Sequence, residues 1–450
     1  MSPYRVAVVG SGPAGVYATE ALVRGRDDVW VDVYDRLPTP YGLVRYGVAP
    51  DHPRIKSIVG ALRKVLERDR VRFLGDVRVG ADVTTGELGA LYDAVVFATG
   101  APTGRRLAIA GEDLAGVWSA ADFVAWYSGH PDHADLGESL GPAAESAVVI
   151  GAGNVALDVA RLLVKSAADL EQTDMPPHVL DRLAHSGVRE VHLVCRRGPE
   201  HARFSAKELR ELLDLDGVGI AIDAEGLPDR STDPLTAANL KAFADLARSG
   251  TVPGGRTLRF HFRTRPVELL GAGGAVAAVR LERTRGPGGT ATPAVGITDL
   301  KAGLVVSAVG HRSTPIGTLP FDEGLGRVPH AAGRVLGADG RAVAGQYVAG
   351  WVKRGPSGVV GTNRACAAET VAAVLADLAD RPPRGAGPEA VDRLLAGRGI
   401  RPVGYDGWLS IDAEEIGRGR ALGRARTKIP DWETLRRVAA GAGRPGPHSA

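Results

Sequence analysis

The stretch Y-R-V-A-V-V-G-S-G-P-A-G, Tyr4–Gly15, joins a predicted strand to a predicted helix through a glycine-rich turn. Its first part runs into apolar sequence typical of a buried parallel strand, and Pro13–Arg24 has the periodicity of a helix. Gly10 permits the tight turn, Gly12 lets the backbone approach a pyrophosphate, and Gly15 lets the helix pack on the strand. The turn therefore predicts a dinucleotide-binding βαβ unit.

An acidic residue follows this turn at the distance that ribose binding requires. Asp35 lies 20 positions after Gly15 (35 − 15), at the end of the next predicted strand, Val29–Tyr34. A carboxylate there accepts hydrogen bonds from ribose hydroxyls, and the helix N-terminus offers N–H groups to phosphates. A chance glycine turn with a surface acid is the alternative. The cofactor-binding residues predicted here are Gly10, Gly12, Pro13, Ala14, Gly15 and Asp35.

A second turn of the same kind, G-A-G-N-V-A at Gly151–Ala156, follows a predicted strand at Ala147–Ile150. It ends in alanine, as is common where NADP binds. The next predicted strand, Glu190–Cys195, ends in two arginines, whose guanidinium groups can hold a 2′-phosphate that an acid would repel. A solvated basic pair is the alternative. The predicted NADPH-binding residues are Gly151, Gly153, Asn154, Val155, Ala156, Arg196 and Arg197.

The two halves of the chain close with similar sequences. L-V-V-S-A-V-G at Leu304–Gly310 echoes A-V-V-F-A-T-G at Ala94–Gly100, where Thr99 and Gly100 are further candidate cofactor contacts. Because 450 residues are too many for one hydrophobic core, the echo predicts two related domains. We expect an α/β fold of two Rossmann-like, three-layer dinucleotide-binding domains, the second inserted into the first: residues 1–105 and 318–450, with a C-terminal tail, carry the first turn, and residues 106–317 carry the second.

Composition excludes several classes of protein. The net charge of +3 is too small to indicate nucleic acid, and no stretch approaches the ~20 apolar residues that span a bilayer. The first strand begins by Tyr4, which leaves no room for a signal segment, so we expect a cytoplasmic protein. Cys195 and Cys366 are far apart, and there is no C-x-x-C pair. The chain therefore lacks a redox dithiol and four-cysteine iron–sulfur ligation, and we predict no metal site.

Several longer strings resemble the adrenodoxin reductase family, which includes the bacterial NADPH–ferredoxin reductases of that type. The similarity runs in order from about Tyr4 to Leu378, and W-L-S-I-D-A-E-E near the C-terminus also resembles a family tail. The strings are Y-G-L-V-R-Y-G-V-A-P-D-H-P (Tyr41–Pro53), G-N-V-A-L-D-V-A-R (Gly153–Arg161), R-R-G-P (Arg196–Pro199), K-E-L-R-E-L (Lys207–Leu212) and G-W-V-K-R-G-P-S-G-V-V-G-T-N (Gly350–Asn363).

This resemblance implies FAD on the first turn, NADPH on the second, and hydride transfer from NADPH to the flavin. Single electrons then pass to a ferredoxin-type iron–sulfur protein, because nicotinamide gives electrons in pairs and ferredoxin takes them singly. A monomer is the expected state. An electron-input module like the glutamate synthase small subunit, or a non-catalytic NADPH/FAD sensor, are the alternatives.

The resemblance also extends the set of site residues. It places His52 and Glu211 near the nicotinamide as catalytic residues, although His52 could simply fix its loop and Glu211 could be an ordinary helix carboxylate. Glu208 is counted with the cofactor-binding residues, while its spacing from Ser205 also fits a capping box. The remaining cofactor-binding residues are Gly42, Leu43, Val44, Trp351, Gly358, Val359 and Val360.

Overall fold

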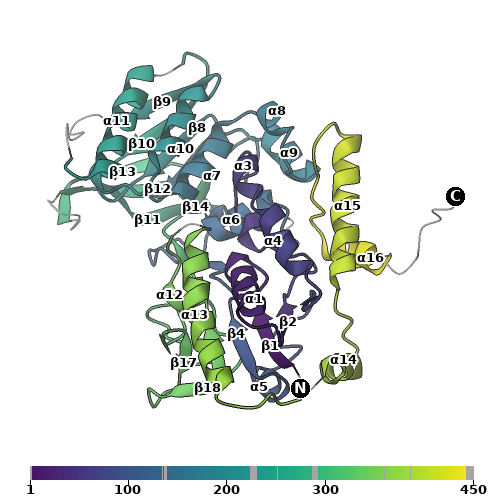
Figure 1. The fold of residues 1–450 in the computed structure, drawn as a ribbon. Helices are drawn as coiled ribbons and strands as arrows, with labels where there is room; N and C mark the ends of the chain where they lie inside the picture. Colours follow the sequence, from purple (N-terminus) through teal and green to yellow (C-terminus); the bar gives the residue numbers. More distant parts are fainter. Residues whose placement is uncertain are drawn as a thin grey trace. The chain divides into compact units, whose positions relative to one another are not determined.

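The computed structural model describes residues 3–133, 135, 139–222, 231–250, 252–285, 292–358, 360–385 and 387–441. The chain divides into two compact units (Figure 1): Met1–Thr103 with His311–Ala450, and Gly104–Gly310. The predicted fold class, an α/β protein with two Rossmann-type domains, is confirmed. The cofactor expected for each domain stays a prediction.

The first unit is built on a seven-stranded sheet in which five strands are parallel. Its order is β16 (His330–Ala331), β17 (Arg334–Leu336), β18 (Ala342–Val348), β4 (Ala94–Phe97), β1 (Tyr4–Val9), β2 (Val29–Tyr34) and β3 (Val71–Leu74). Both faces of β1 are buried, because Val6 and Val8 point to one core and Ala7 and Val9 to the other. This explains why the strand reads as a nearly continuous apolar run.

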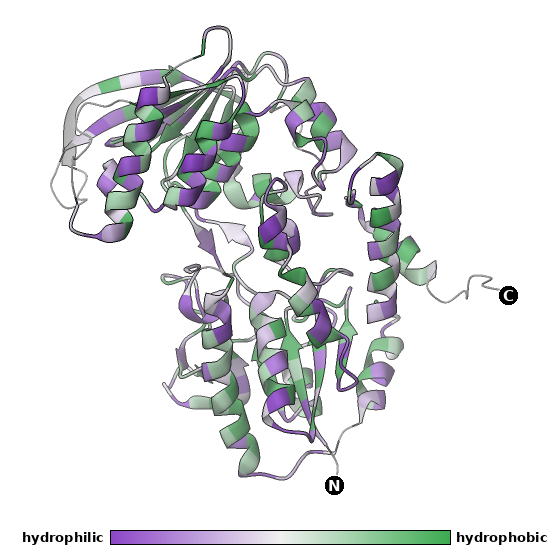
Figure 2. Cartoon of the chain, turned by 45° about the horizontal axis from the view of Figure 1, so that its top comes forward, coloured by the Kyte–Doolittle hydropathy of each residue, from purple (hydrophilic) through white to green (hydrophobic). Residues whose placement is uncertain are grey.

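Helices cover both faces of this sheet. One face packs against α1 (Pro13–Gly25), α4 (Val59–Leu66), α13 (Thr362–Ala379), α15 (Tyr405–Ala421) and α16 (Trp432–Ala440). The other packs against α5 (Thr85–Leu91) and α14 (Pro388–Gly397). Figure 2 shows the central strands as mainly hydrophobic and the helices as mixed. The C-terminal string W-L-S-I-D-A-E-E lies within α15.

The second unit is built on a six-stranded parallel sheet. Its order is β6 (Val117–Ser119), β14 (Leu304–Ser307), β7 (Ser146–Ile150), β8 (Glu190–Val194), β10 (Arg256–His261) and β9 (Val218–Ile222). One face packs against an antiparallel sheet of β11 (Thr264–Ala272), β12 (Ala275–Arg285) and β13 (Thr292–Lys301). Helices α7 (Asn154–Val164) and α11 (Pro234–Ser249) lie over the other face.

From the sequence alone, Leu258–Arg263, Val267–Leu270 and Val276–Arg283 are expected to be three antiparallel strands, and this prediction is wrong for the first of them. β10 joins the parallel sheet between β8 and β9, and only β11–β13 form the antiparallel sheet. The reason is that a short apolar run reads the same in both kinds of sheet, and its partners are set by tertiary contacts.

Among the described helices none is long and apolar enough to cross a membrane.

Candidate functional site

The first glycine turn connects β1 to α1 and leaves a space that no side chain fills. A Cβ on Gly15 would lie 1.8 Å from the Gly10 carbonyl oxygen, and one on Gly10 would lie 2.5 Å from the Ala98 carbonyl oxygen. Both positions therefore require glycine. A Cβ on Gly12 would meet nothing nearer than the Gly42 Cα at 3.9 Å. Gly12 thus keeps open the space before the N–H groups of α1, where a phosphate is bound in such turns.

Asp35 is tied to this turn by a residue that the sequence reasoning missed, Ser11. The Ser11 backbone N–H and hydroxyl both donate to Asp35 Oδ2, at 2.9 and 2.5 Å, and the Leu37 N–H donates to Oδ1 at 3.0 Å. Burial raises the pKa of Asp35, although these hydrogen bonds oppose the shift. The carboxylate is thereby fixed at the end of β2. The sequence did offer a signal for Ser11, because its hydroxyl-bearing side chain lies between the turn residues Gly10 and Gly12.

The short helix α2 (Leu43–Tyr46) begins beside the same turn. The Tyr41 N–H donates to the Ser11 carbonyl at 3.0 Å. A Cβ on Gly42 would lie 3.1 Å from the Gly12 Cα. Val44 is buried, whereas Leu43 is 38% exposed. The structure therefore brings the predicted residues Gly42–Val44 next to Gly12, with Leu43 accessible.

The segment that follows β18 also reaches this turn. A Cβ on Gly350 would lie 2.5 Å from the Ala14 Cβ, and the Gly350 N–H donates to Cys366 Sγ at 3.3 Å. Trp351 begins α12 (Trp351–Arg354), and its ring centroid is 5.5 Å from that of His311. Gly350, which the sequence reasoning did not single out, is thus the contact that brings Trp351 to the first turn.

The other predicted contacts in this unit have simpler surroundings. Thr99 and Gly100 follow β4, and the Gly100 carbonyl accepts from the Ser313 hydroxyl at 2.7 Å. Gly358 has a φ of 79°, which favours glycine, and Val360 packs partly buried against the core. Val359 lies outside the described residues.

The second turn repeats this geometry between β7 and α7. A Cβ on Gly151 would lie 2.5 Å from the Ala308 carbonyl oxygen, while one on Gly153 would meet nothing within 4 Å. Val155 is partly exposed and Ala156 is buried in α7. Asn154 Oδ1 accepts from the Ser205 N–H at 2.9 Å. The second turn is therefore also open in front of its helix.

Arg196 and Arg197 follow β8, and hydrogen bonds to their carbonyl groups fix the backbone. The Thr284 hydroxyl donates to the Arg196 carbonyl at 2.9 Å, and the Arg263 N–H donates to the Arg197 carbonyl at 3.1 Å. Within the described ranges, neither guanidinium makes an ion pair or hydrogen bond. Two positive charges at the carboxyl end of a parallel strand are suited to an anionic group.

Glu208 lies in α10 (Ala206–Glu211), beside the buried pair of Asp158 and Arg161, whose charged atoms are 2.8 Å apart. The expected capping box is only half formed. Ser205 Oγ accepts from the Glu208 N–H at 3.2 Å, but the Ser205 N–H donates to Asn154 instead. Burial and the neighbouring Asp158 raise the pKa of Glu208 to about 7, although Arg161 opposes the shift. The carboxyl group of Glu208 therefore faces the charged pair of α7, the helix that follows the second turn.

The two residues predicted as catalytic belong to different units. His52 precedes the one-turn helix α3 (Pro53–Lys56), and its carbonyl accepts from the Ile55 N–H at 3.2 Å. Glu211 ends α10, 3.8 Å from the Lys207 ammonium. These contacts are also what a loop-fixing histidine and a surface carboxylate would make, so the catalytic roles stay predictions.

Both cysteines are buried thiols whose sulfur atoms contact the backbone of a glycine. Cys195 Sγ donates to the Gly151 carbonyl at 3.3 Å, and burial raises the pKa of its thiol. Cys366 accepts from Gly350, as described above. In the part of the chain that the structure describes, no three His, Cys, Asp or Glu side chains gather to bind a metal ion.

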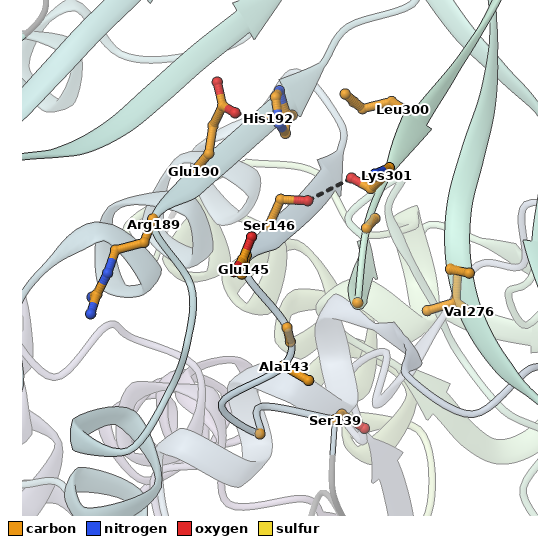
Figure 3. Close-up of a pocket in the computed structure, with 15 residues that line it drawn as sticks. Ser139, Ala143, Glu145, Ser146, Arg189, Glu190, His192, Val276, Leu300 and Lys301 are labelled. Atoms are coloured by element: carbon orange, nitrogen blue, oxygen red, sulfur yellow. Dashed lines mark hydrogen bonds and ion pairs between the residues drawn. The ribbon is translucent and has the colours of Figure 1, made fainter. Parts of the chain in front are cut away.

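A pocket of about 880 Å³ lies in the second unit, away from the predicted site residues. Figure 3 shows Ser146, Glu190 and Lys301 on its wall, with the Ser146 hydroxyl donating to the Lys301 carbonyl at 2.5 Å. Ser146 and Glu190 are the first residues of β7 and β8, so the pocket is at the amino edge of the sheet. Dinucleotides bind at the carboxyl edge of such sheets, which is where Gly151 and Arg196 lie.

Comparison with known proteins gives consistent matches. Residues 4–221 match the family model described as pyridine nucleotide-disulphide oxidoreductase. The chain is 39% identical, over 97% of its length and 96% of the relative, to the mitochondrial NADPH:adrenodoxin oxidoreductase of Arabidopsis thaliana. It is 42% identical, over 98% of its length and all of the relative, to the NADPH-ferredoxin reductase FprA of Mycobacterium tuberculosis. A solved structure of that FprA in complex with NADPH superposes with a TM-score of 0.91, at 40% identity, covering 98% of this chain and 100% of the other.

The geometry of the first turn predicts that two alanine substitutions act differently. Gly15→Ala forces α1 away from Gly10 and should lower the free energy of unfolding by ~2 kcal/mol or more. Gly12→Ala should change it by less than about 0.5 kcal/mol but abolish dinucleotide binding at this turn, because the new methyl group enters the phosphate space. Urea unfolding and a dinucleotide titration measure the two effects. Gly60→Ala, in a helix with nothing within 4 Å, is the control.

The raised pKa of Glu208 predicts a stability that depends on pH. The folded protein holds the proton of Glu208 more tightly than the unfolded chain does. Glu208 therefore adds to the free energy of unfolding at low pH, and this contribution is lost as the pH rises from the ordinary pKa of a glutamate towards 7. This shift corresponds to about 2.5 kcal/mol between pH 5 and pH 8, and solvent screening at the half-buried carboxyl reduces it to about 1 kcal/mol, so Glu208→Gln should gain about 1 kcal/mol in the free energy of unfolding relative to the wild type over this range. Urea unfolding at both values tests this. A gain of the same size in the exposed Glu433→Gln variant would contradict the assignment.

Proposed function

The chain belongs to the adrenodoxin reductase family, and we infer that it is an FAD-dependent NADPH–ferredoxin reductase. It takes hydride from NADPH onto FAD and passes single electrons to a ferredoxin-type iron–sulfur protein. The observation that carries this proposal is one chain with two open glycine turns, one backed by a carboxylate and the other by two unneutralised guanidinium groups. The relatives' names support an NADPH–ferredoxin reductase activity.

The residues of the first turn fit FAD. Gly12 and Gly42 leave room for a pyrophosphate before α1, and Asp35 presents a fixed carboxylate for the ribose. When bound, FAD converts the electron pair that NADPH gives into the single electrons that ferredoxin takes. Trp351 and the backbone at Gly358 are the residues that we assign to the ring system, with Val359 and Val360 beside them.

The residues of the second turn fit NADPH rather than NADH. Gly153 and Asn154 begin α7, whose N–H groups face the phosphates, and Arg196 with Arg197 would hold the 2′-phosphate. We assign to Glu211 the stabilisation of the positive charge that forms on the nicotinamide, and to His52 a hydrogen bond that orients it. Hydride transfer needs no general base, so neither residue has to remove a proton.

Two other functions are less well supported. An electron-input module like the glutamate synthase small subunit usually carries iron–sulfur cysteines, and both cysteines of this chain are buried and far apart in sequence. A sensor without turnover would not need the Trp351–Gly358 segment against the first turn. The monomeric state and the cytoplasmic location stay predictions.

Reduction of the flavin by NADPH is the direct test of this function. The purified protein should be yellow, and its absorbance near the flavin maximum should bleach within seconds of anaerobic mixing with NADPH. Addition of an oxidised ferredoxin should restore the colour, because the iron–sulfur cluster accepts the electrons. Stopped-flow absorbance measures both steps. A flavin that stays oxidised would support the sensor, and a flavin reduced but never reoxidised by any ferredoxin would contradict the assigned partner class.

The arginine pair predicts the nucleotide preference. Replacing Arg196 and Arg197 together by alanine should lower kcat/KM for NADPH by about 100-fold or more and leave that for NADH nearly unchanged, since each of the two phosphate contacts is worth on the order of 1.5–3 kcal/mol. Arg189→Ala is a matched control, because Arg189 precedes the other end of the same strand and is exposed. If the double variant keeps the preference for NADPH over NADH, the two arginines do not bind the 2′-phosphate and are only a solvated basic pair at the end of the strand.

A further inference from the structure

The loop that leads into α2 holds a non-glycine residue, Tyr41, in an unfavourable backbone conformation. Tyr41 has a φ of 81°, a region that residues other than glycine rarely adopt, and Gly42 follows with a φ of 49°. Tyr41 is nevertheless buried, and its N–H is bonded to Ser11 in the first turn. Surrounding structure must therefore hold this backbone in place next to Gly12.

Much of that structure comes from the C-terminal helix α15, more than 350 residues later in the chain. The Tyr41 hydroxyl lies 3.4 Å from the Tyr405 hydroxyl. The Tyr41 ring packs edge to face on Trp408, with centroids 5.8 Å apart. Both contacts fix the side chain of the residue whose backbone is strained. All of these residues belong to the first unit.

A buried ion pair joins α2 itself to α15. Arg45 donates through both terminal nitrogens to Glu415, at 2.9 and 2.5 Å, and the Glu415 side chain is fully buried. Burial alone would raise the pKa of Glu415, but the adjacent Arg45 and Arg426 outweigh it and hold the pKa below its usual value. Glu415 is thus a charged group in the core that needs its arginine partners.

The segment after α15 also contacts Arg45 and Glu415. The Lys428 ammonium donates to the Arg45 backbone carbonyl at 2.9 Å, and Lys428 is only 2% exposed. The Ile429 N–H donates to Glu415 Oε1 at 2.9 Å. The backbone of α2 and the side chain of Arg45 are therefore both held by the C-terminal tail.

We propose that α15 is a positioning element of the FAD site, in which Glu415, Tyr405 and Trp408 hold the Tyr41–Tyr46 loop against the first glycine turn. The inference rests on the proposed function for the identity of the ligand. It assigns the tail a role in retaining the cofactor, distinct from a role in stabilising the fold alone.

The test compares two neighbouring glutamates on α15. Glu415→Gln removes the buried charge at constant size, whereas Glu414→Gln makes the same change at an exposed residue whose ion pair, among the described residues, is with Arg418. The dissociation constant for FAD is measured on deflavinated protein by quenching of flavin fluorescence, at a temperature where far-ultraviolet circular dichroism shows both variants folded. The circular dichroism of the bound flavin is recorded as well.

Glu415→Gln should raise the dissociation constant for FAD at least 10-fold and alter the flavin circular dichroism, while Glu414→Gln should match the wild type within twofold. If Glu415→Gln unfolds at a lower temperature but binds FAD within twofold of the wild type, α15 is only a stabilising helix and the proposal is overturned. If Glu415→Gln does not fold, the dissociation constant for FAD is measured on Arg45→Met and judged by the same limits. In that variant Glu415 still has Arg426 and the Ile429 N–H as hydrogen-bond partners. A wild-type protein that binds no FAD would instead overturn the proposed function.

Discussion

In both units the glycine turn is fixed by a carbonyl oxygen that occupies the place of a side chain. A Cβ on Gly10 would lie 2.5 Å from the Ala98 oxygen, and one on Gly151 would lie 2.5 Å from the Ala308 oxygen. Packed atoms do not approach so closely, so only glycine lets the first strand end this near to its neighbour. The approach sets the direction in which the following helix begins, and hence the point at which its N–H groups meet a phosphate.

The same contact explains the internal echo of the sequence. Ala98 and Ala308 follow β4 and β14, and these strands lie parallel to and beside β1 and β7. Each must end with its carbonyl against the first glycine of a turn, and each then runs into a glycine with positive φ, Gly100 or Gly310. The repeat is thus a steric requirement imposed twice, and the two units share it because both build the same turn.

Local sequence predicted the parts of the molecule that depend on local geometry. The two turns, the acid after β2 and the arginines after β8 follow from spacing along one βαβ unit. The pairing of β10 and the cover of the second sheet by β11–β13 depend on strand partners that no spacing encodes. The half-formed capping box at Ser205 has the same cause, because the competing acceptor, Asn154, comes from another helix. The pair of Arg45 and Glu415 spans 370 residues and has no sequence signal at all.

The two turns differ in what closes them, and this difference bears on how each cofactor is held. Around the first turn, the Tyr41–Tyr46 loop packs on Gly12 and is itself fixed by a buried ion pair to α15. Around the second, the nearest fixed groups are the backbone of Arg203, which donates to Ala152, and the N–H of Ser205, while Arg196 remains exposed. The first site is thus bounded by groups that buried contacts hold in place, whereas the second site presents Arg196 to solvent. Such an arrangement suits a retained FAD and an NADPH that exchanges in every turnover.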